Sequence, residues 1–510
     1  MTRGLYASPL LAGALLGLPA PAAAQADVAA ELQAMRSKIA ELEAKVERLE
    51  AERAGASGVA SSPVPPAAGQ VAAAEAPSPT PAPGADAPLP VATAKAETDI
   101  VWRGAPQLRQ DETGFSFKVR GFAQFDTGFV GNPRGAIPTQ NLGYNSRARR
   151  LVLGAEGTLP GGFGYKAELN YGGGNLGYED VIITYAPKDS PLSITLGNFF
   201  PLAGLEATTS SRLGSVLERE QASDAFGLER RIGVAARYTD PNDRGLFEAG
   251  IFNSTIDAGF DNNGWQASAR AVYSPRVGER GRLHLGINFQ HRETPSGAQN
   301  VRYRSRPLTQ ITDIRFVDTQ PIAASGDDIL GLELVGIFGP FHFAAEGHRS
   351  WVSGHRPGTL FVPPDGISSG VSYVGNPVFQ TGYAEVGVYL TGETRPYRSG
   401  RWDNLKVLNP LGRGGWGALQ LNARIDRTDL RDRVGPTYAY PDFIDGGIQT
   451  AYQLSAIWNA TDYIRFLLQY SRIEVEGGPF ALDVRPDLTV PSYQRTYGTD
   501  SLAVRTQVEF

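Results

Sequence analysis

Arginine supplies most of the positive charge that could bind other molecules, because only seven of the 48 basic residues are lysine. A guanidinium keeps its charge in almost any environment and grips phosphate or carboxylate groups through two parallel donors. The stretch 200–231 mixes such arginines with acids. Among its charged residues are Arg212, Arg219, Arg230, Arg231, Glu206, Glu218, Glu220 and Glu229. In a narrow passage, opposed charges would orient polar solutes and select them by sign; the simpler interpretation is a solvated surface loop with balanced charges.

Other chemistries find little support. The chain has no cysteine, which excludes disulfides, thiolate metal sites and a cysteine nucleophile. His342, Glu346 and His348 share one face of a predicted strand, as a metal site would permit, but a row of polar residues facing water explains them equally well. No catalytic triad is marked, no helix follows Gly172-Gly173-Gly174, and a net charge of −5 does not favour nucleic acid. We therefore predict no catalytic residues, no metal, no cofactor and no nucleic-acid partner.

The elements that would position the arginines alternate apolar and polar residues from Phe115 to the C-terminus. The closing stretch 502–510 (LAVRTQVEF) shows the pattern, since successive side chains of a strand point to opposite faces. The same alternation recurs in sixteen segments. The predicted strands are 115–126, 146–157, 163–171, 179–186, 191–199, 231–238, 246–253, 265–273, 282–292, 328–338, 341–351, 379–391, 416–426, 448–458, 462–472 and 500–510.

This arrangement predicts an all-β transmembrane barrel of sixteen antiparallel strands over residues 111–510. An even strand number and alternating short turns and long loops are typical of the bacterial outer membrane, with both ends in the periplasm. Closure removes strand edges, which lipid cannot satisfy, and sixteen strands enclose water. The connection 392–415 is long although it falls on the short-turn side. A soluble double sheet is the structural alternative, but it would not need charges on every opposite face.

Alternation also predicts which charges face the lumen. Arg150 shares its face with Glu156, whereas Arg147 and Arg149 share theirs with leucines, so either these two lie at headgroup level or a β-bulge turns one inward. Other inward candidates are Lys118, Arg120, Lys166, Arg231, Arg237, Arg270, Arg282, Arg424, Arg505, Glu156, Glu168 and Asp426. The predicted pore-lining set is Arg150, Lys166, Arg212, Arg219, Arg230, Arg231, Arg237, Glu218 and Glu220.

The residues before the barrel divide into three predicted segments. Residues 1–26 are a signal peptide with an apolar run and cleavage after Ala24 or Ala26. Residues 27–54 form a short periplasmic coiled coil, because apolar residues recur at heptad positions a and d with opposite charges between them; the heptads favour oligomerisation and lean toward two strands. Residues 55–110 are an Ala/Pro-rich linker.

The barrel sequence resembles the phosphate-selective porin O and P family of Gram-negative outer membranes. The resemblance covers most of 115–510. The segments that carry it are GFAQFD (121–126), RRLVLGAEG (149–157), LGNFFPLAGLE (196–206), FGLERRIGVAARY (226–238), TGYAEVGVYLTGETRPY (381–397), GWGALQLNARID (415–426), SAIWNATDYIRFLLQYSR (455–472) and LAVRTQVEF (502–510).

The resemblance implies a trimeric porin in which 200–230, 293–327 and 392–415 fold into the pore and the coiled coil lies at the three-fold axis. It implies ladder roles for Arg150, Arg230 and Arg231. One departure is that lysines, which the family places around the pore mouth, are nearly absent from the loops. The expected partners are outer-membrane lipid, two further copies in a homotrimer, small anionic or polar solutes, and the barrel assembly machinery through Phe510.

Three functional hypotheses follow. The first is a water-filled, anion-preferring porin for phosphate-like or other small polar solutes. The second is a non-selective or substrate-specific diffusion pore, which the inward acids permit. The third, an outer-membrane barrel enzyme or surface-binding protein, lacks a catalytic set in the sequence.

Overall fold

The computed structural model describes residues 98–102, 104–137, 142–174, 176–258, 264–295, 299–354, 375–435 and 443–510. The predicted signal peptide (1–26), the predicted coiled coil (27–54) and most of the predicted linker (55–110) lie outside these residues. Among the described helices, none combines the length and apolar character needed to cross a membrane.

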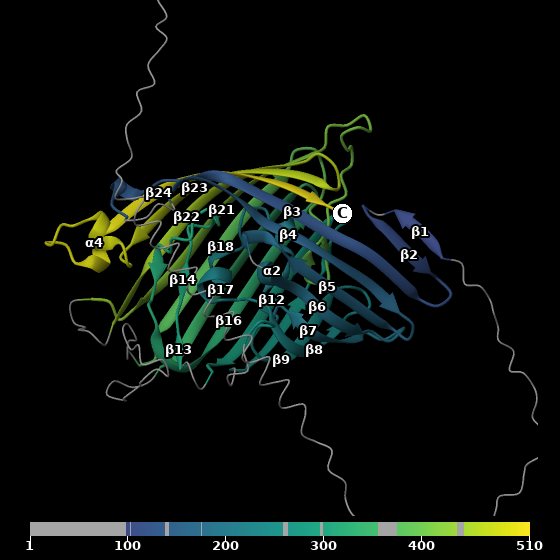
Figure 1. The fold of residues 1–510 in the computed structure, drawn as a ribbon, viewed down its shortest axis with the longest axis horizontal. Helices are drawn as coiled ribbons and strands as arrows, with labels where there is room; N and C mark the ends of the chain where they lie inside the picture. The colour runs from purple at the N-terminus through teal and green to yellow at the C-terminus, as the bar shows by residue number, and fades with distance from the viewer. Residues whose placement is uncertain are drawn as a thin grey trace, which may run out of the picture. The chain divides into compact units, whose positions relative to one another are not determined.

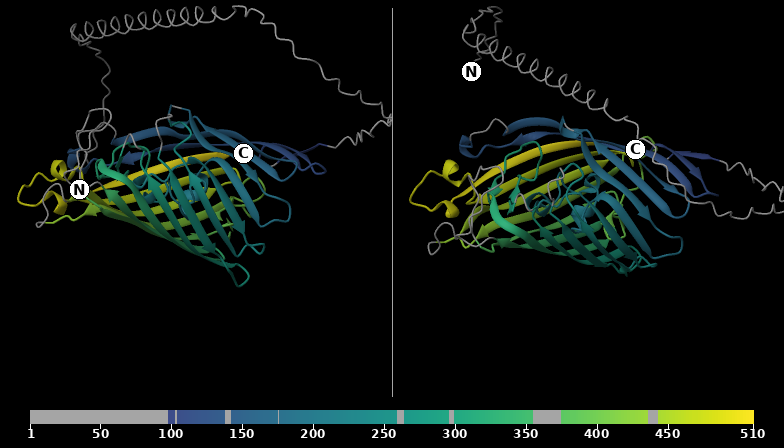
Figure 2. Two further views of the ribbon diagram at one scale, coloured as in Figure 1. Left: turned by 90° about the horizontal axis from the view of Figure 1, so that it is seen from below. Right: turned by 60° about the horizontal axis from the view of Figure 1, so that its bottom comes forward.

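Sixteen antiparallel strands form a closed barrel, as the alternation predicted (Figures 1 and 2). Each predicted strand overlaps one observed strand, and β24 pairs with β3 to close the wall. The strands of the wall are β3 (Phe115–Val130), β4 (Gly143–Leu159), β5 (Phe163–Asn170), β6 (Gly177–Tyr185), β7 (Leu192–Phe199), β8 (Arg231–Thr239), β9 (Gly245–Phe252), β10 (Gln266–Tyr273), β12 (Gly281–Glu293), β16 (Ile322–Phe338), β17 (Phe341–Gly354), β18 (Val378–Tyr389), β21 (Ala418–Asp432), β22 (Ile444–Asn459), β23 (Ile464–Glu476) and β24 (Thr496–Glu509).

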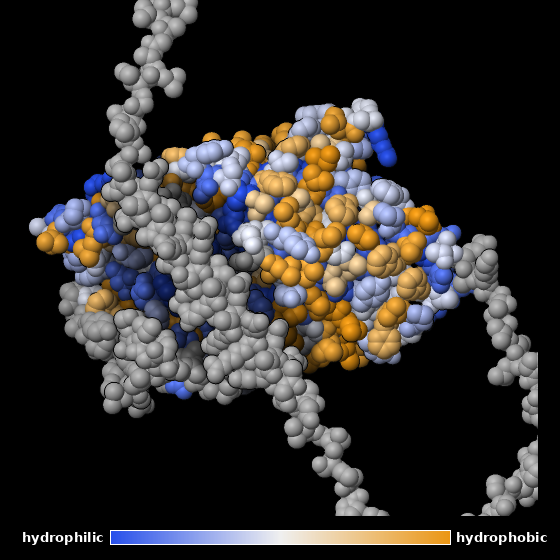
Figure 3. Space-filling model, in the orientation of Figure 1, coloured by the Kyte–Doolittle hydropathy of each residue, from blue (hydrophilic) through white to orange (hydrophobic). Residues whose placement is uncertain are grey.

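The wall is apolar outside and polar inside, the reverse of a soluble protein. On β24, Leu502 and Val508 are exposed on the outer face, whereas Arg505 and Gln507 are buried on the inner face. Apolar side chains gather on the barrel surface in Figure 3. This distribution matches an outer face in contact with acyl chains and a lumen that holds the charges.

A β-bulge decides the direction of the arginines on β4. The β3–β4 register pairs Gln124 with Arg150 and Phe125 with Ala148, which leaves Arg149 as the extra residue. Beyond the bulge the faces exchange, so Arg147 also turns inward and its guanidinium donates to the Gln310 carbonyl at 2.7 Å. Of the two possibilities that the sequence left open for Arg147 and Arg149, the structure contains the bulge.

A hairpin before the barrel covers an exposed edge of β3. β1 (Asp99–Trp102) pairs with β2 (Pro106–Gln110), and β2 pairs with the start of β3. The last residue, Phe510, exchanges backbone hydrogen bonds of 3.1 and 3.0 Å with Gly121, so β3 runs on past the end of the chain. The final part of the predicted linker 55–110 is therefore two strands, because the unpaired start of β3 needs a neighbour.

Three connections enter the lumen. The lumen loop (200–230) contains α2 (Leu205–Thr208), η3 (Ser211–Leu213) and α3 (Gln221–Ala225). The outer insert (299–321) contains β13 (Asn300–Val301), β14 (Arg304–Ser305) and β15 (Val317–Asp318), and the inner insert (390–417) contains β19 (Tyr397–Arg398) and β20 (Arg401–Trp402). The remaining short elements are η1 (Pro133–Gly135), η2 (Gly172–Gly174), β11 (Arg276–Val277), α4 (Ala481–Val484) and η4 (Ser492–Gln494).

An apolar cluster joins the lumen loop to the outer insert inside the barrel. The Phe226 ring lies 5.4 Å from the Tyr303 ring, which lies 5.2 Å from the Phe379 ring of β18. All three side chains are buried. This packing fixes the two connections against each other and against the wall.

Gly204 permits the lumen loop to begin its first helical turn. Its φ is +120°, and a Cβ there would lie 2.5 Å from Oε2 of Glu346. We expect Gly204→Ala to lower the free energy of opening of the lumen loop by about 1–3 kcal/mol, because both the strain and the contact oppose the native position. Amide hydrogen exchange over 200–230 measures this free energy of opening.

The matched control is Gly227→Ala in the same loop, where φ is +59° and no other atom lies within 4 Å of the new Cβ. Its effect should be smaller, and exchange of the wall strands should stay unchanged in both variants. Equal exchange of the lumen loop in the two variants would contradict this role of Gly204.

Candidate pore constriction

The lumen loop is held to one side of the barrel by carboxylates. Glu346 on β17 accepts the backbone N–H groups of Leu205 and Glu206 at 2.8 and 2.9 Å. The Glu206 carboxylate in turn accepts two hydrogen bonds, of 2.6 and 3.0 Å, from the Arg424 guanidinium on β21. All three side chains are buried, and Glu346 and Arg424 lie on the inward faces of their strands, so the start of the loop is fixed inside the lumen.

The same loop reaches the opposite part of the wall. Glu218 accepts two hydrogen bonds of 2.8 Å from Arg149 on β4 and one of 2.9 Å from Arg505 on β24. The Leu217 backbone N–H donates to Gln469 on β23 at 2.7 Å. The lumen loop therefore crosses the barrel interior and narrows it.

The two inserts pack against this loop. Asp224 of the lumen loop accepts from Arg306 at 3.1 Å and Arg315 at 2.6 Å, both in the outer insert. From the inner insert, the backbone N–H of Trp402 donates to Thr209 Oγ1 at 3.3 Å, and the Arg395 guanidinium donates to the Ser215 hydroxyl. All three connections that the resemblance placed in the pore thus contribute to the interior.

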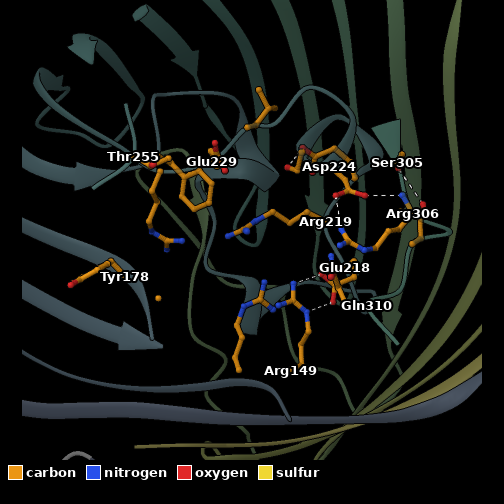
Figure 4. Close-up of a pocket in the computed structure, with 18 of the residues that line it drawn as sticks. Arg149, Tyr178, Glu218, Arg219, Asp224, Glu229, Thr255, Ser305, Arg306 and Gln310 are labelled. Atoms are coloured by element: carbon orange, nitrogen blue, oxygen red, sulfur yellow. Dashed lines mark hydrogen bonds and ion pairs between the residues drawn. The ribbon is translucent and has the colours of Figure 1, made fainter. Parts of the chain in front are cut away.

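A cavity of about 460 Å³ lies beside the lumen loop (Figure 4). Arginines and acids both line it: Arg149, Arg150, Arg219, Arg230, Arg306, Glu218, Glu220, Asp224, Glu229 and Asp257. Figure 4 shows Arg149 and Arg219 entering the cavity from different sides, with Glu218 close to Arg149. The predicted pore-lining residues that the structure brings together here are Arg150, Arg219, Arg230, Glu218 and Glu220.

Two of these arginines have no carboxylate within ion-pair distance among the described residues. Arg150 is buried and donates to Gln124 Oε1 at 3.1 Å. Arg219 donates to the carbonyl oxygens of Glu206 at 3.1 Å and Thr209 at 2.8 Å. Both groups bind neutral partners, so their charge is available to an anion that enters the cavity.

The acids of the cavity are arranged differently. Glu218 is neutralised by Arg149 and Arg505, while Asp224 is neutralised by the outer insert. Glu229 and Asp257 pair with no cation among the described side chains, but both are exposed. Uncompensated positive charge therefore lies deeper in the cavity than uncompensated negative charge.

Burial affects the two neighbouring acids of the lumen loop in opposite ways. For Glu220, burial and the Glu206 carboxylate raise the pKa well above its usual value, which favours the neutral acid. For Glu218, burial is outweighed by Arg149 and Arg505, which lower the pKa. For Arg219, burial and the nearby Arg230 lower the pKa, because both destabilise its positive charge. An anion bound close by would stabilise that charge.

Further arginines continue from the cavity along β23 and β24. Arg505 donates to the Leu217 carbonyl at 2.5 Å and Arg465 to the Arg212 carbonyl at 2.6 Å. Arg212 itself pairs with Glu509 at 2.8 Å near the short-turn end. Arg505 and Arg465 hold the lumen loop through its carbonyl oxygens. Arg505 is neutralised by Asp126 and Glu218, whereas Arg465 has no carboxylate within ion-pair distance among the described residues.

Four predicted pore residues do not line this cavity: Arg212, which is paired with Glu509, and Lys166, Arg231 and Arg237. Lys166 is neutralised by Glu168 and Asp180 at 2.8 and 2.7 Å. Arg237 pairs with Glu248, and Arg231 donates to the Asn253 carbonyl at 3.3 Å. Arg230 lines the cavity, yet it is also paired with Glu179 and Asp180 at 2.5 and 2.7 Å. The alternation placed Lys166, Arg231 and Arg237 on the inner face of the wall. It does not show which acid lies next to each of these side chains.

Sequence reasoning missed several contributors. The inward position of Arg149 depends on the β-bulge, which the sequence pattern does not show. The positions of Arg306 and Arg395 depend on how the two inserts fold. Arg465 could have been found, because it shares its strand face with the inward Gln469 and Ser471. The row His342, Glu346 and His348 serves the interior, since Glu346 caps the lumen loop and His348 Nε2 lies 3.3 Å from the Ala203 carbonyl. Within the described ranges, no group of three or more His, Asp or Glu side chains is arranged to hold a metal.

Known proteins resemble the chain across the barrel. The family model for "Phosphate-selective porin O and P" matches residues 117–510. An uncharacterized protein of Caulobacter vibrioides is 35% identical over 485 residues, covering 92% of this chain and 90% of that protein. Porin O of Pseudomonas aeruginosa is 23% identical over 422 residues, covering 75% of this chain and 88% of that protein. Among solved structures, an anion-selective porin from Comamonas acidovorans is 10% identical with a TM-score of 0.43, covering 78% of this chain and all of that one.

The opposite pKa shifts in the lumen loop predict opposite effects of two matched substitutions. Glu218→Gln removes a stabilising ion and should lower the opening free energy of 200–230 at pH 7 by about 1–3 kcal/mol. That loss should shrink as the pH falls below about 4.3, where the unfolded carboxyl is protonated. Glu220→Gln removes the cost of keeping an acid neutral, so it should raise the opening free energy at pH 7 and have no effect at low pH.

Amide hydrogen exchange of 200–230 from about pH 2.5 to pH 8 compares the two variants with the parent on both sides of the unfolded carboxyl pKa of about 4.3. Each variant is the control for the other, because both replace a lumen-loop carboxyl by its amide. The same sign for both changes at pH 7 would contradict the assignment of charge states.

Proposed function

The chain belongs to the phosphate-selective porin O and P family and forms a porin channel in the outer membrane, and we propose that this channel prefers anions. The observation that supports the proposal is the pair Arg150 and Arg219. Both line the cavity beside the constriction, and neither is neutralised by a carboxylate among the described side chains. Phosphate-like anions and other small polar solutes are the proposed passengers.

The arrangement supports a stepwise passage. An anion that enters from the long-loop side first meets the exposed acids, and then the deeper arginines, where reduced hydration strengthens the attraction. Further toward the short-turn end, Arg465 offers one more guanidinium without a carboxylate partner among the described residues, because it donates to the carbonyl oxygens of Arg212 and Gly214. Several sites of similar strength let a solute leave as readily as it enters, which conduction requires.

The paired acids limit how tightly an anion is held. Glu218 neutralises part of the charge of Arg149 and Arg505. Without it, Arg149 would join Arg150 and Arg219 as a cavity-lining guanidinium without a carboxylate partner, and the three would hold a divalent anion more tightly and slow its passage. We therefore assign Glu218 two roles: it holds the lumen loop in place, and it limits the affinity of the cavity for anions. We propose no catalytic activity for the protein.

The assembly is proposed to be a homotrimer. A trimer is the state implied by the family resemblance, and the heptads of 27–54 favour oligomerisation, although they lean toward two strands. We place this N-terminal segment in the periplasm, because short turns and both chain ends share that side in such barrels. The half-exposed Phe510 at the end of β24 is the proposed signal for the barrel assembly machinery.

Anion preference should depend on the two unpaired arginines. We expect Arg150→Gln with Arg219→Gln to lower the anion-to-cation permeability ratio by roughly fivefold per charge, since one charge at about 4 Å in water is worth about 1 kcal/mol. The reversal potential in a salt gradient across a planar bilayer measures the ratio, and phosphate added against chloride reports competition for the same path.

Arg231→Gln is the matched control, because Arg231 also lacks a carboxylate partner in the described structure but does not line the cavity. It should lower the permeability ratio much less than the double substitution, because its charge lies outside the cavity. A parent channel with no anion preference would support the non-selective pore instead, and a preference that survives the double substitution would place selectivity elsewhere.

Deletion of 27–54 tests the assembly. The deletion should leave a folded barrel, because every wall strand lies after these residues, but it should weaken association of the subunits. The temperature at which purified oligomers separate into single barrels, measured by gel mobility, should fall. An unchanged separation temperature would assign assembly to the barrel alone.

A further inference from the structure

The outer wall carries a groove that the channel function does not use. It has a volume of about 590 Å³ and lies across β16, β17, β18 and β21. Leu332, Gly347, Gly382 and Arg427 are consecutive partners in the strand register, so they form one row around the wall. The two adjacent glycines remove the side chains that would otherwise fill the middle of this row.

The groove is apolar on one side and positively charged on the other. Leu332 on β16 is exposed, while Arg349 and Arg427 are exposed on β17 and β21. Arg349 lies over the Trp351 ring, with its guanidinium carbon 5.5 Å from the ring centre. Arg427 donates to Thr450 Oγ1 at 3.1 Å.

Neither of these arginines has a carboxylate within ion-pair distance among the described residues. Arg472, an outward arginine on β23, two strands from β21, differs because it pairs with Asp500 at 3.1 Å. Asp429 also lines the groove, but its carboxylate accepts the Arg431 backbone N–H at 3.1 Å and lies 3.7 Å from the Arg431 guanidinium. The groove therefore presents two cations that the protein leaves unneutralised on its lipid-facing side.

The depth of the arginines places them at a headgroup layer. β17 begins at Phe341, directly after the short turn at Gly339-Pro340, and Arg349 follows further along the strand. A membrane-spanning β-strand needs about 9–11 residues, so Arg349 reaches the interface on the long-loop side. Long loops face the cell exterior in bacterial barrels, which makes this the outer leaflet.

We infer that the groove binds a phosphorylated glycolipid of the outer leaflet. Its phosphate would bridge Arg349 and Arg427, and an acyl chain would lie over Gly347 and Gly382 against Leu332. Guanidinium groups bind phosphate through paired donors, and two uncompensated cations at a membrane surface attract an anionic headgroup. Trp351 at the same level is typical of the membrane interface. The inference does not depend on the ion preference of the channel.

The test uses the purified full-length porin in detergent, with lipid A carrying both phosphates as the probe and native mass spectrometry as the measurement. Arg349→Gln with Arg427→Gln should weaken lipid A binding by about tenfold or more, since each lost charge-assisted contact corresponds to about that factor. Dephosphorylated lipid A should bind the parent as weakly as lipid A binds the double variant.

Two further variants separate the parts of the site. Arg472→Gln is the matched control and should leave binding unchanged, because Arg472 is already paired with Asp500. Gly347→Leu should weaken binding by filling the groove; its Cβ has room, with the nearest atom 3.9 Å away. Planar-bilayer conductance of all variants should match the parent.

Three results would overturn the inference. Equal binding by the double variant and the parent would remove the arginines from the site. Equal binding of lipid A with and without its phosphates would leave the charges without a role. Loss of subunit association in the double variant without lipid would show that a second copy of the chain covers the groove.

Discussion

A bilayer offers no hydrogen-bond partner to the backbone, and this constraint governs the whole molecule. Every strand of the wall has two neighbours, and the pairing of β24 with β3 removes the last edge. Where β3 extends beyond Phe510, β2 takes over as its partner. Once the wall is closed in this way, alternate side chains must face the lumen, so the barrel gathers a large part of its charge in a confined aqueous space.

Charge in that space must be compensated, and the lumen loop supplies the compensation. Its Glu206 meets Arg424 on one side, and its Glu218 meets Arg149 and Arg505 on the other. The same contacts that neutralise the wall therefore fix the loop across the lumen. Only the arginines that bind carbonyls or amides instead of carboxylates, such as Arg150 and Arg219, keep an available charge.

The sequence was sufficient to predict the barrel, because alternation with a period of two is a local property and recurs in each wall strand. It was also sufficient to place Arg150, Lys166 and Arg237 on the inner face. It could not predict that Lys166 and Arg237 are neutralised. Their partners Asp180 and Glu248 lie on neighbouring strands, and the sequence of one strand does not determine its register with the next. Arg149 was uncertain for a related reason, since one extra residue in a strand exchanges its faces.

The preference for arginine over lysine connects the fold to the proposed selectivity. A guanidinium has five donors in one plane, so one edge can bind a carbonyl of the lumen loop while the remaining donors face the passage. Arg219 and Arg465 are both bound to loop carbonyls in this way. An ammonium group has three donors on a single nitrogen and would be consumed by the same structural contacts. The residues that hold the constriction in place can therefore also provide its charge, and a pore built on this principle needs few lysines at its mouth.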